Sequence, residues 1–327
     1  MVSILKRIAP ALGARVLFEP EFRIVGRIRF RNGRQSFFWH NKFNLNSVSA
    51  ARIAQDKGYT LFFLAAEGIR VPRTQTFFRE DFRRRMQSPR GVAAACEFAR
   101  KLGKPLYLKP LRGSQGAGIE LATTAAEVKA GVRRIFAREQ TLLVQEACAG
   151  RDYRLVMLDG KLISAYERVP LGVTGDGRAT IRELLQRRND EFIAEGRDTR
   201  INFADRRLRA GLRRLRLRLT SVLARGRHVR LLEVANLSCG GTSVDVTRVV
   251  HPSVARLAAR VARALDLRFA GVDILMPDIT RPLKTYVVLE VNSAPGLDHY
   301  AQGGAAQVSH VDWLYRQVLQ AIARGPR

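Results

Sequence analysis

Two stretches near the end of the sequence carry acidic and amide side chains inside apolar runs. Residues 286–291 predict a strand, and Glu290 and Asn292 stand two positions apart on it and project from one face. Residues 269–276 predict a second strand, in which Asp273 interrupts an apolar run. A buried carboxylate is costly unless it meets a cation, and Mg²⁺ prefers oxygen ligands. The three residues therefore predict a metal cluster on two paired strands; a solvated strand face is the alternative for Glu290 and Asn292 alone.

A glycine-rich loop lies between two short strands at residues 109–118. Three glycines allow backbone N–H groups to gather around phosphate oxygens, and Lys109 adds a positive charge. The segment is neither a GxxxxGK[ST] loop nor a GxGxxG fingerprint that opens a helix. It predicts a phosphate site, and a plain flexible hairpin turn is the other interpretation.

A strand at 142–146 leads into a small, irregular linker that ends at Gly150. Such a linker can offer free N–H and C=O groups to a flat heterocycle, with Asp152 reaching a ribose. Turn chemistry explains Gly150 equally well. Residues 152–157 and 161–169 predict a hairpin, and Thr180 with Glu183 predicts a capped helix.

The charge of the chain indicates acidic partners. The 57 Lys and Arg residues against 29 Asp and Glu residues give a formal net charge of +28, which attracts anions over long distances. Residues 200–230 hold eleven arginines and one acidic residue, and leucines at 208, 212, 215, 219 and 223 predict an amphipathic basic helix. A basic helix docked on the core with a solvated face is the simpler interpretation; contact with a membrane or an acidic polymer is the other.

The remaining patterns bound the class of protein. A chain of 327 residues with 46% hydrophobic residues can form two or three subdomains around a cleft. The three cysteines show no metal-binding or disulfide spacing, so we expect a reducing cytoplasm. No signal peptide and no apolar run of membrane-spanning length are apparent. Residues 16–40 predict a hairpin about Asn32-Gly33, and 231–236 predict a strand.

These motifs, in this order, resemble the ATP-grasp superfamily, and within it the central ATP-grasp domain of cyanophycin synthetases. The resemblance covers about residues 50–300. The matching segments are Asp56-Lys57, the 109–118 loop, 150–154, 167–170, 175–177, 235–238, 240–242, 245–247, 251–252, 270–273, 277–279 and 290–297. The resemblance implies an α+β fold with two α+β subdomains that clamp ATP, and a short N-terminal extension.

The resemblance also implies roles for individual residues. Those expected at the nucleotide are Lys57 and Lys109 on the phosphates, Ser114, Gln115, Gly116 and Gly118 in a lid, Gln145, Glu146, Ala147 and Cys148 along adenine, and Asp152 on the ribose. Those expected at the reacting groups are Asp273, Glu290 and Asn292 for two Mg²⁺ ions (with Mn²⁺ as a substitute), Arg154 and Arg168 facing the γ-phosphate and the acceptor carboxylate, and Ser238, Gly240, Gly241 and Thr242 beside the second substrate.

From the resemblance we expect an ATP-dependent ligase that joins a carboxylate to an amine through an acyl phosphate and releases ADP. Cyanophycin synthetases carry further N-terminal and muramyl-ligase-like domains that this sequence lacks, so we expect a stand-alone ligase of an amino acid or acidic peptide. An acidic polymer and a homodimer are further partner options, and a nucleic acid is not expected. The alternatives are an ATP-grasp kinase of a small hydroxyl substrate and a basic nucleic-acid-binding protein derived from such an enzyme.

The expected domains are a truncated N-terminal segment with a β-hairpin (1–50), a helical linker subdomain (51–90), a small lid subdomain (91–147) and a large subdomain (148–327). The basic helix is expected as an insert in the large subdomain at about 200–230.

Overall fold

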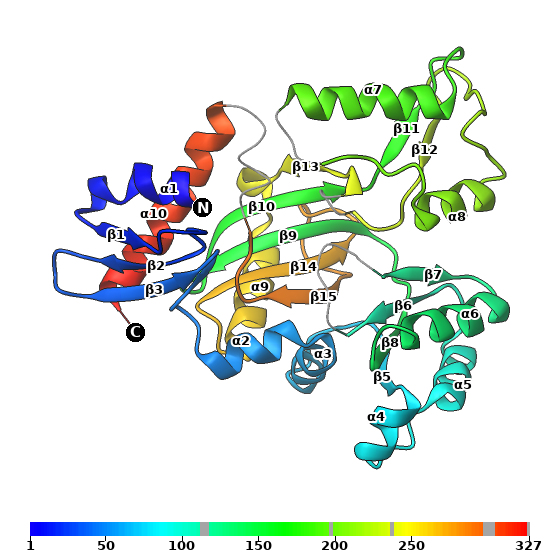
Figure 1. The fold of residues 1–327 in the computed structure, drawn as a ribbon, viewed down its shortest axis with the longest axis horizontal. Coiled ribbons are helices and arrows are strands. Elements are labelled where there is room, and N and C mark those ends of the chain that lie inside the picture. Colours follow the sequence, from blue (N-terminus) through cyan, green and yellow to red (C-terminus); the bar gives the residue numbers. More distant parts are fainter. Residues whose placement is uncertain (112–117, 196–198, 236–238, 297–304, 326–327) are drawn as a thin grey trace.

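The computed structural model describes residues 1–327 apart from 112–117, 196–198, 236–238, 297–304 and 326–327. Within this described part, the strands form four antiparallel sheets with helices packed on them (Figure 1). The expected α+β class is confirmed.

The N-terminal segment forms a small sheet that shares its core with the C-terminal helix. Helix α1 (Val2–Ile8) and a 3₁₀ turn (Pro10–Leu12) precede β1 (Arg15–Phe18), β2 (Val25–Arg29), β3 (Gln35–Trp39) and β4 (Lys42–Phe43). Strands β2 and β3 form the hairpin predicted about Asn32-Gly33, and Gly33 has a left-handed φ of 82°. Helix α10 (Ala305–Arg324) packs on this segment through Val311, Leu314 and Val318.

The largest sheet has the order β13-β10-β9-β14-β15 (Figure 1). Its strands are β13 (Thr242–Asp245), β10 (Lys161–Val169), β9 (Arg151–Leu158), β14 (Phe269–Met276) and β15 (Val287–Asn292). Alternate apolar residues on one face pack against α2 (Val48–Gln55), α3 (Lys57–Ala66) and α9 (Pro252–Ala264). A 3₁₀ turn (Thr247–Val249) links β13 to α9.

The opposite face of this sheet is divided into an apolar half and a charged half. Val156, Leu158 and Phe269 lie under α10 and the N-terminal segment, and they belong to that core. Farther along the same two strands, Arg154 pairs in register with Asp273. The charged half is therefore a continuation of a buried face, which explains why its side chains are themselves largely shielded from water.

A second α+β unit contains the sheet β5-β8-β6-β7. Its strands are β5 (Thr74–Phe78), β6 (Leu106–Pro110), β7 (Glu120–Ala122) and β8 (Thr141–Glu146). Helices α5 (Val92–Leu102) and α6 (Ala125–Phe136) share an apolar core with it, and α4 (Glu80–Arg85) follows β5. Figure 1 shows this unit at the lower right, beyond the β15 side of the large sheet.

The basic insert differs from the prediction. Helix α7 (Ile181–Ala194) has the predicted capping box of Thr180 and Glu183, and α8 spans only Arg206–Arg214. Arg216 has a left-handed φ of 55°, so the helix does not continue to Leu219 and Leu223. Those leucines instead pack from an irregular segment into the core around β11 (Gly172–Thr174) and β12 (His228–Arg230).

A predicted strand at 231–236 is also wrong over its described residues, 231–235, which are irregular. Leu231 and Leu232 are buried there, so the apolar run reflects packing in the core of the insert rather than a strand. No helix in the described ranges is both long enough and apolar enough to cross a bilayer.

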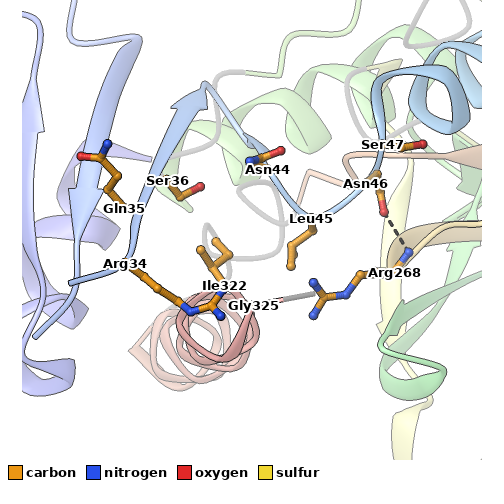
Figure 2. Close-up of a pocket in the computed structure, with 10 residues that line it drawn as sticks. All are labelled: Arg34, Gln35, Ser36, Asn44, Leu45, Asn46, Ser47, Arg268, Ile322 and Gly325. Atoms are coloured by element: carbon orange, nitrogen blue, oxygen red, sulfur yellow. Dashed lines mark hydrogen bonds between the residues drawn. The ribbon is translucent and has the colours of Figure 1, made fainter. Parts of the chain in front are cut away.

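Asn46 joins the N-terminal segment to the large sheet. Its Oδ1 accepts hydrogen bonds from the backbone N–H groups of Arg268 (2.9 Å) and Phe269 (3.0 Å), and its Nδ2 donates to the carbonyls of Phe269 (2.7 Å) and Ser293 (2.8 Å). Figure 2 shows the bond between Asn46 and Arg268 at the edge of a cavity of about 290 Å³, which is lined by Arg34 and Arg268 among others. Asn46 thus fixes the start of β14 and the segment after β15.

Candidate active site

The predicted acidic residues lie side by side on the charged half of the large sheet. Asp273 pairs in register with Arg154 of β9 on one side and with Glu290 of β15 on the other. Asn292 is the register partner of Gly271, and it therefore lies on the same face. The sequence thus correctly predicted that these three residues come together on paired strands.

Two arginines hold the Asp273 carboxylate. Arg154 donates from Nε to Oδ1 (2.5 Å) and from Nη2 to Oδ2 (2.6 Å), and Arg168 Nη2 donates to Oδ2 (2.8 Å). The Asp273 side chain is only 3% exposed. Burial alone would raise its pKa, but the two guanidinium groups outweigh burial, and the pKa is lowered. The cations that this buried carboxylate meets in the structure are therefore arginines.

Arg168 is shared between two carboxylates. Its Nη2 also donates to Asp152 Oδ1 (2.7 Å). Burial raises the pKa of Asp152, while the charge of Arg168 acts in the opposite direction. The resemblance implied that Asp152 binds the ribose. In the structure, Asp152 instead contacts Arg168, which was expected to face the γ-phosphate or the acceptor carboxylate.

Together, Arg154, Arg168, Asp273, Glu290 and Asn292 form a charged row across the sheet. Glu290 and Asn292 lie at its more exposed end. The Glu290 side chain is 32% exposed, and Lys57 Nζ of α3 lies 3.7 Å from its Oε2. The hydrogen-bonding pattern orients the Asn292 amide so that its oxygen accepts from Arg154 Nη2 (2.9 Å) and its nitrogen donates to Glu290 Oε1 (3.3 Å). Gly271 is needed here, because a Cβ on it would lie 2.9 Å from Pro295 Cβ.

The second sheet contributes Lys109 to the same cluster. Lys109 Nζ donates to Gln145 Oε1 (2.5 Å), and Gln145 Nε2 donates to Thr74 Oγ1 (3.1 Å). Burial lowers the pKa of Lys109 to about 8; the negative charge of Glu290 acts in the opposite direction, and the positive charge of Lys57 lowers the pKa further. Glu290 of β15 and Lys57 of α3 therefore lie close enough to Lys109 of β6 to affect its pKa, although Lys109 belongs to the other α+β unit.

The linker after β8 has its own contacts. Glu146 forms an ion pair with Arg73 Nε (2.6 Å) and accepts from Cys148 Sγ (3.6 Å). Burial raises the pKa of the Cys148 thiol to about 11, and the Glu146 charge adds to that shift. The backbone N–H of Ala147 donates to the Pro105 carbonyl (3.4 Å). Cys148 is therefore a neutral thiol and is not prepared as a nucleophile.

Several predicted residues lie outside the described ranges or away from the charged row. Residues 238–242 form a second glycine-containing segment of the sequence, called here the second glycine loop. Ser238 of this loop, like Ser114, Gln115 and Gly116 of the lid, is not among the residues that the structure describes. Gly118 and Gly240 have left-handed φ values of 72° and 90°, which favour glycine. Thr242 opens β13, and Gly241 directly precedes it.

One contact near the second glycine loop was missed from the sequence. Arg207 of α8 donates from Nη2 to Cys239 Sγ (3.3 Å) and also pairs with Asp205 (2.7 Å). The sequence offers no partner near Cys239 because Arg207 is 32 positions away. Only the packing of the insert against the loop brings these residues together.

The donor set at the charged row fits Mg²⁺ in its chemistry. It contains two carboxylates and one amide oxygen on one sheet face, which are hard oxygen ligands. Glu290 and Asn292 are partly exposed, whereas both Asp273 oxygens accept from arginines. Oδ1 of Asp273 accepts one of the three arginine hydrogen bonds and Oδ2 the other two, so Oδ1 keeps a lone pair that could bind a metal ion.

In its fold, the protein is similar to solved ATP-grasp ligases. The family described as "RimK-like ATP-grasp domain" matches residues 230–310. A bifunctional glutathione synthetase from Pasteurella multocida has a similar structure, with a TM-score of 0.58, 20% identity, and coverage of 93% of this chain and 42% of that chain. A D-alanine–D-alanine ligase from Bacillus anthracis gives a TM-score of 0.51 at 15% identity, covering 85% of this chain and 69% of the ligase. These two likenesses confirm the predicted fold.

In sequence, the chain is similar to cyanophycin synthetase. The enzyme of Geminocystis herdmanii is 35% identical over 262 residues, which are 77% of this chain and 29% of the relative. A bifunctional protein of glutathione biosynthesis from Streptococcus mutans is 32% identical over 219 residues, or 63% of this chain and 29% of the relative. The resemblance inferred from the motifs is thus confirmed, and the chain spans less than a third of the length of these curated relatives.

Proposed function

We propose that this protein is an ATP-dependent ligase that forms an amide bond between a carboxylate and an amine through an acyl phosphate and releases ADP. The observation that carries the proposal is the charged row: Arg154 and Arg168 converge on Asp273, with Glu290, Asn292 and Lys57 beside them. Similarity to cyanophycin synthetase and to glutathione biosynthesis proteins, whose names imply amino acid or peptide products, supports the same reaction class.

The cationic residues would bind and orient the anionic reactants. Lys57 and Lys109 approach Glu290 from two different elements, so phosphate groups bound here would meet positive charge from both. Arg154 and Arg168 would hold the acceptor carboxylate and the transferring phosphoryl group, whose developing charge they neutralise. Each of these arginines is largely buried, which strengthens its interaction with an anion by limiting water around it.

Mg²⁺ held by Asp273, Glu290 and Asn292 would supply further neutralisation of phosphate charge. Asp273 would take part through the lone pair of Oδ1 that the arginine bonds leave available. Gln145 would keep Lys109 oriented, and the linker from Gln145 to Cys148 would border the adenine. Gly240, Gly241 and Thr242, with Ser238, would border the second substrate.

We propose amino acids or acidic peptides as substrates, and an acidic polymer or a second copy of the chain as further partners. The net charge of +28 supports an acidic substrate. None of the three cysteines, all of which the structure describes, forms a disulfide, and this supports the proposed cytoplasmic location. We also propose the domain division 1–50, 51–90, 91–147 and 148–327. The first segment packs on the last one, because it shares its apolar core with α10.

A substrate screen tests the proposed function. The purified protein is incubated with ATP, Mg²⁺, pairs of amino acids and short acidic peptides, and the release of ADP and the product mass are measured. A ligase releases ADP only when an acid and an amine are both present, with a product lighter than their sum by one water. ADP release with a single hydroxyl substrate would instead assign a kinase, and AMP release would contradict the acyl-phosphate route.

A further inference from the structure

The outer face of the N-terminal sheet carries aromatic and basic side chains in alternating positions. Its register places Leu17, Arg27 and Phe37 in one row across β1, β2 and β3. The next row toward β4 contains Val25, Trp39 and Lys42. Leu17 is 61% exposed, Phe37 66% and Trp39 60%. Burying these side chains would be favourable, so their exposure on one face indicates a binding surface.

A third row on the same face is basic. It contains Arg15, Arg29 and Gln35, all exposed. Within the described ranges, neither arginine makes an ion pair with a carboxylate. Residues 15–52 as a whole contain eight Lys and Arg residues and two Glu residues. One of these, Glu19, accepts from the backbone N–H groups of Glu21 and Ile24, so it belongs to the loop structure.

A groove of about 960 Å³ runs along this sheet. It is lined by Leu17, Arg27, Phe37 and Trp39 of the sheet, and its other border is α2, with Val48 and Arg52. Figure 1 shows the sheet at the left of the molecule, on the side opposite the β5-β8-β6-β7 unit that carries Lys109. This surface is therefore separate from the charged row of the candidate active site.

We propose that this face binds single-stranded nucleic acid. Phe37 and Trp39 are two positions apart on one strand, about 6.8 Å along it, so each ring can stack on a base. The arginines around them lie where the phosphate backbone of such a strand would run, and a net charge of +28 opposes docking of a second copy of the chain on this face. An acidic peptide would satisfy the arginines but would leave the two rings without planar partners.

The test measures binding of fluorescein-labelled 12-nucleotide oligo(dT) and oligo(U) by anisotropy, with a polyglutamate peptide of matched charge as competitor. The protein is the full chain. Replacing Phe37 and Trp39 together with alanine is expected to weaken oligonucleotide binding about tenfold or more. Phe62→Ala is the matched control, because Phe62 is equally exposed at 65% but lies on α3; it is expected to leave binding unchanged.

A second pair of variants tests the phosphate contacts. Replacing Arg15 and Arg29 with glutamine is expected to reduce the slope of log affinity against log salt by about 1.4, the value for two lost phosphate contacts on a single strand. The stacking variant should keep the slope of the parent protein. Thermal unfolding checks that both double variants are folded.

Tryptophan fluorescence reports stacking directly. The chain has two tryptophans, so a Trp313→Phe background leaves only Trp39. Quenching of Trp39 by the oligonucleotide, and none by polyglutamate, is the expected result. The proposal is overturned if polyglutamate binds as tightly as the oligonucleotides, if the stacking variant binds normally, or if the face is instead occupied in a dimer that dissociates in that variant.

Discussion

Asp273 and Glu290 are register partners on neighbouring strands, yet we expect their neutralisation to have very different effects on stability. Asp273 is 3% exposed and accepts three hydrogen bonds from Arg154 and Arg168. Removing its charge leaves two largely buried guanidinium groups without their main counter-ion. Breaking a buried ion pair from one side costs about 3–5 kcal/mol, so we expect Asp273→Asn to lower the free energy of unfolding by about that amount.

Glu290→Gln is the matched comparison. Glu290 is 32% exposed, and among the described residues its ion-pair partner is Lys57, at 3.7 Å. A pair this long, with one partner still in contact with water, contributes no more than about 1 kcal/mol, so the Glu290→Gln variant should unfold nearly like the parent protein. Its ATP turnover should nevertheless be abolished, because Glu290 is proposed to help hold the metal at the phosphates.

Urea unfolding followed by circular dichroism measures the difference. With a slope of about 3 kcal/mol per molar urea, Asp273→Asn should shift the unfolding midpoint by about 1–2 M, and Glu290→Gln by less than about 0.4 M. Equal midpoints for the two variants would refute the conclusion that Asp273 is the counter-ion on which Arg154 and Arg168 depend. Retained turnover in Glu290→Gln would separately refute its metal role.

Three further results are expected. Because burial lowers the pKa of Lys109 to about 8, its charge is present below that pH and lost above it, so ATP affinity measured by calorimetry should fall as the pH rises through 8; Lys109→Met should remove this dependence, and an unchanged profile would contradict it. Glutamine at Arg209, Arg213 and Arg216, which are exposed on the insert, should raise KM for an acidic substrate at low salt and leave kcat nearly unchanged; an unchanged KM would make these residues a solvated face. With its pKa raised to about 11, the half-buried Cys148 should react slowly with iodoacetamide at pH 7.5, as read by mass spectrometry, whereas rapid alkylation would contradict a neutral thiol.

Sequence reasoning succeeded where the local pattern and the final packing agree. The period-two placement of Glu290 and Asn292, with Asp273 in an apolar run, was enough to bring the three residues to one face of a sheet. It was not enough to find what neutralises Asp273, because Arg154 and Arg168 come from strands more than one hundred positions earlier. The register of β9 and β10 decides that contact, and no local pattern encodes it.

The prediction of one amphipathic helix in the basic insert was wrong for a different reason. Leu208 and Leu212 do lie on a helix, but Leu219 and Leu223 continue the same spacing from an irregular segment. Helix α8 ends at Arg214, and Arg216 adopts a left-handed conformation that arginine seldom takes and that the sequence does not signal. Leucine periodicity reports burial, and here the burial comes from tertiary packing around β11 and β12.

The fate of oxygen from the substrate carboxylate tests the proposed reaction most directly. The protein is incubated with ATP, Mg²⁺, the amine and an acid whose carboxylate is labelled with ¹⁸O, and the phosphate released with ADP is analysed by mass spectrometry. We predict that each phosphate carries one labelled oxygen, since the acid attacks the γ-phosphoryl group and the amine then displaces phosphate from the acyl phosphate. Unlabelled phosphate, or label in AMP, would contradict the account.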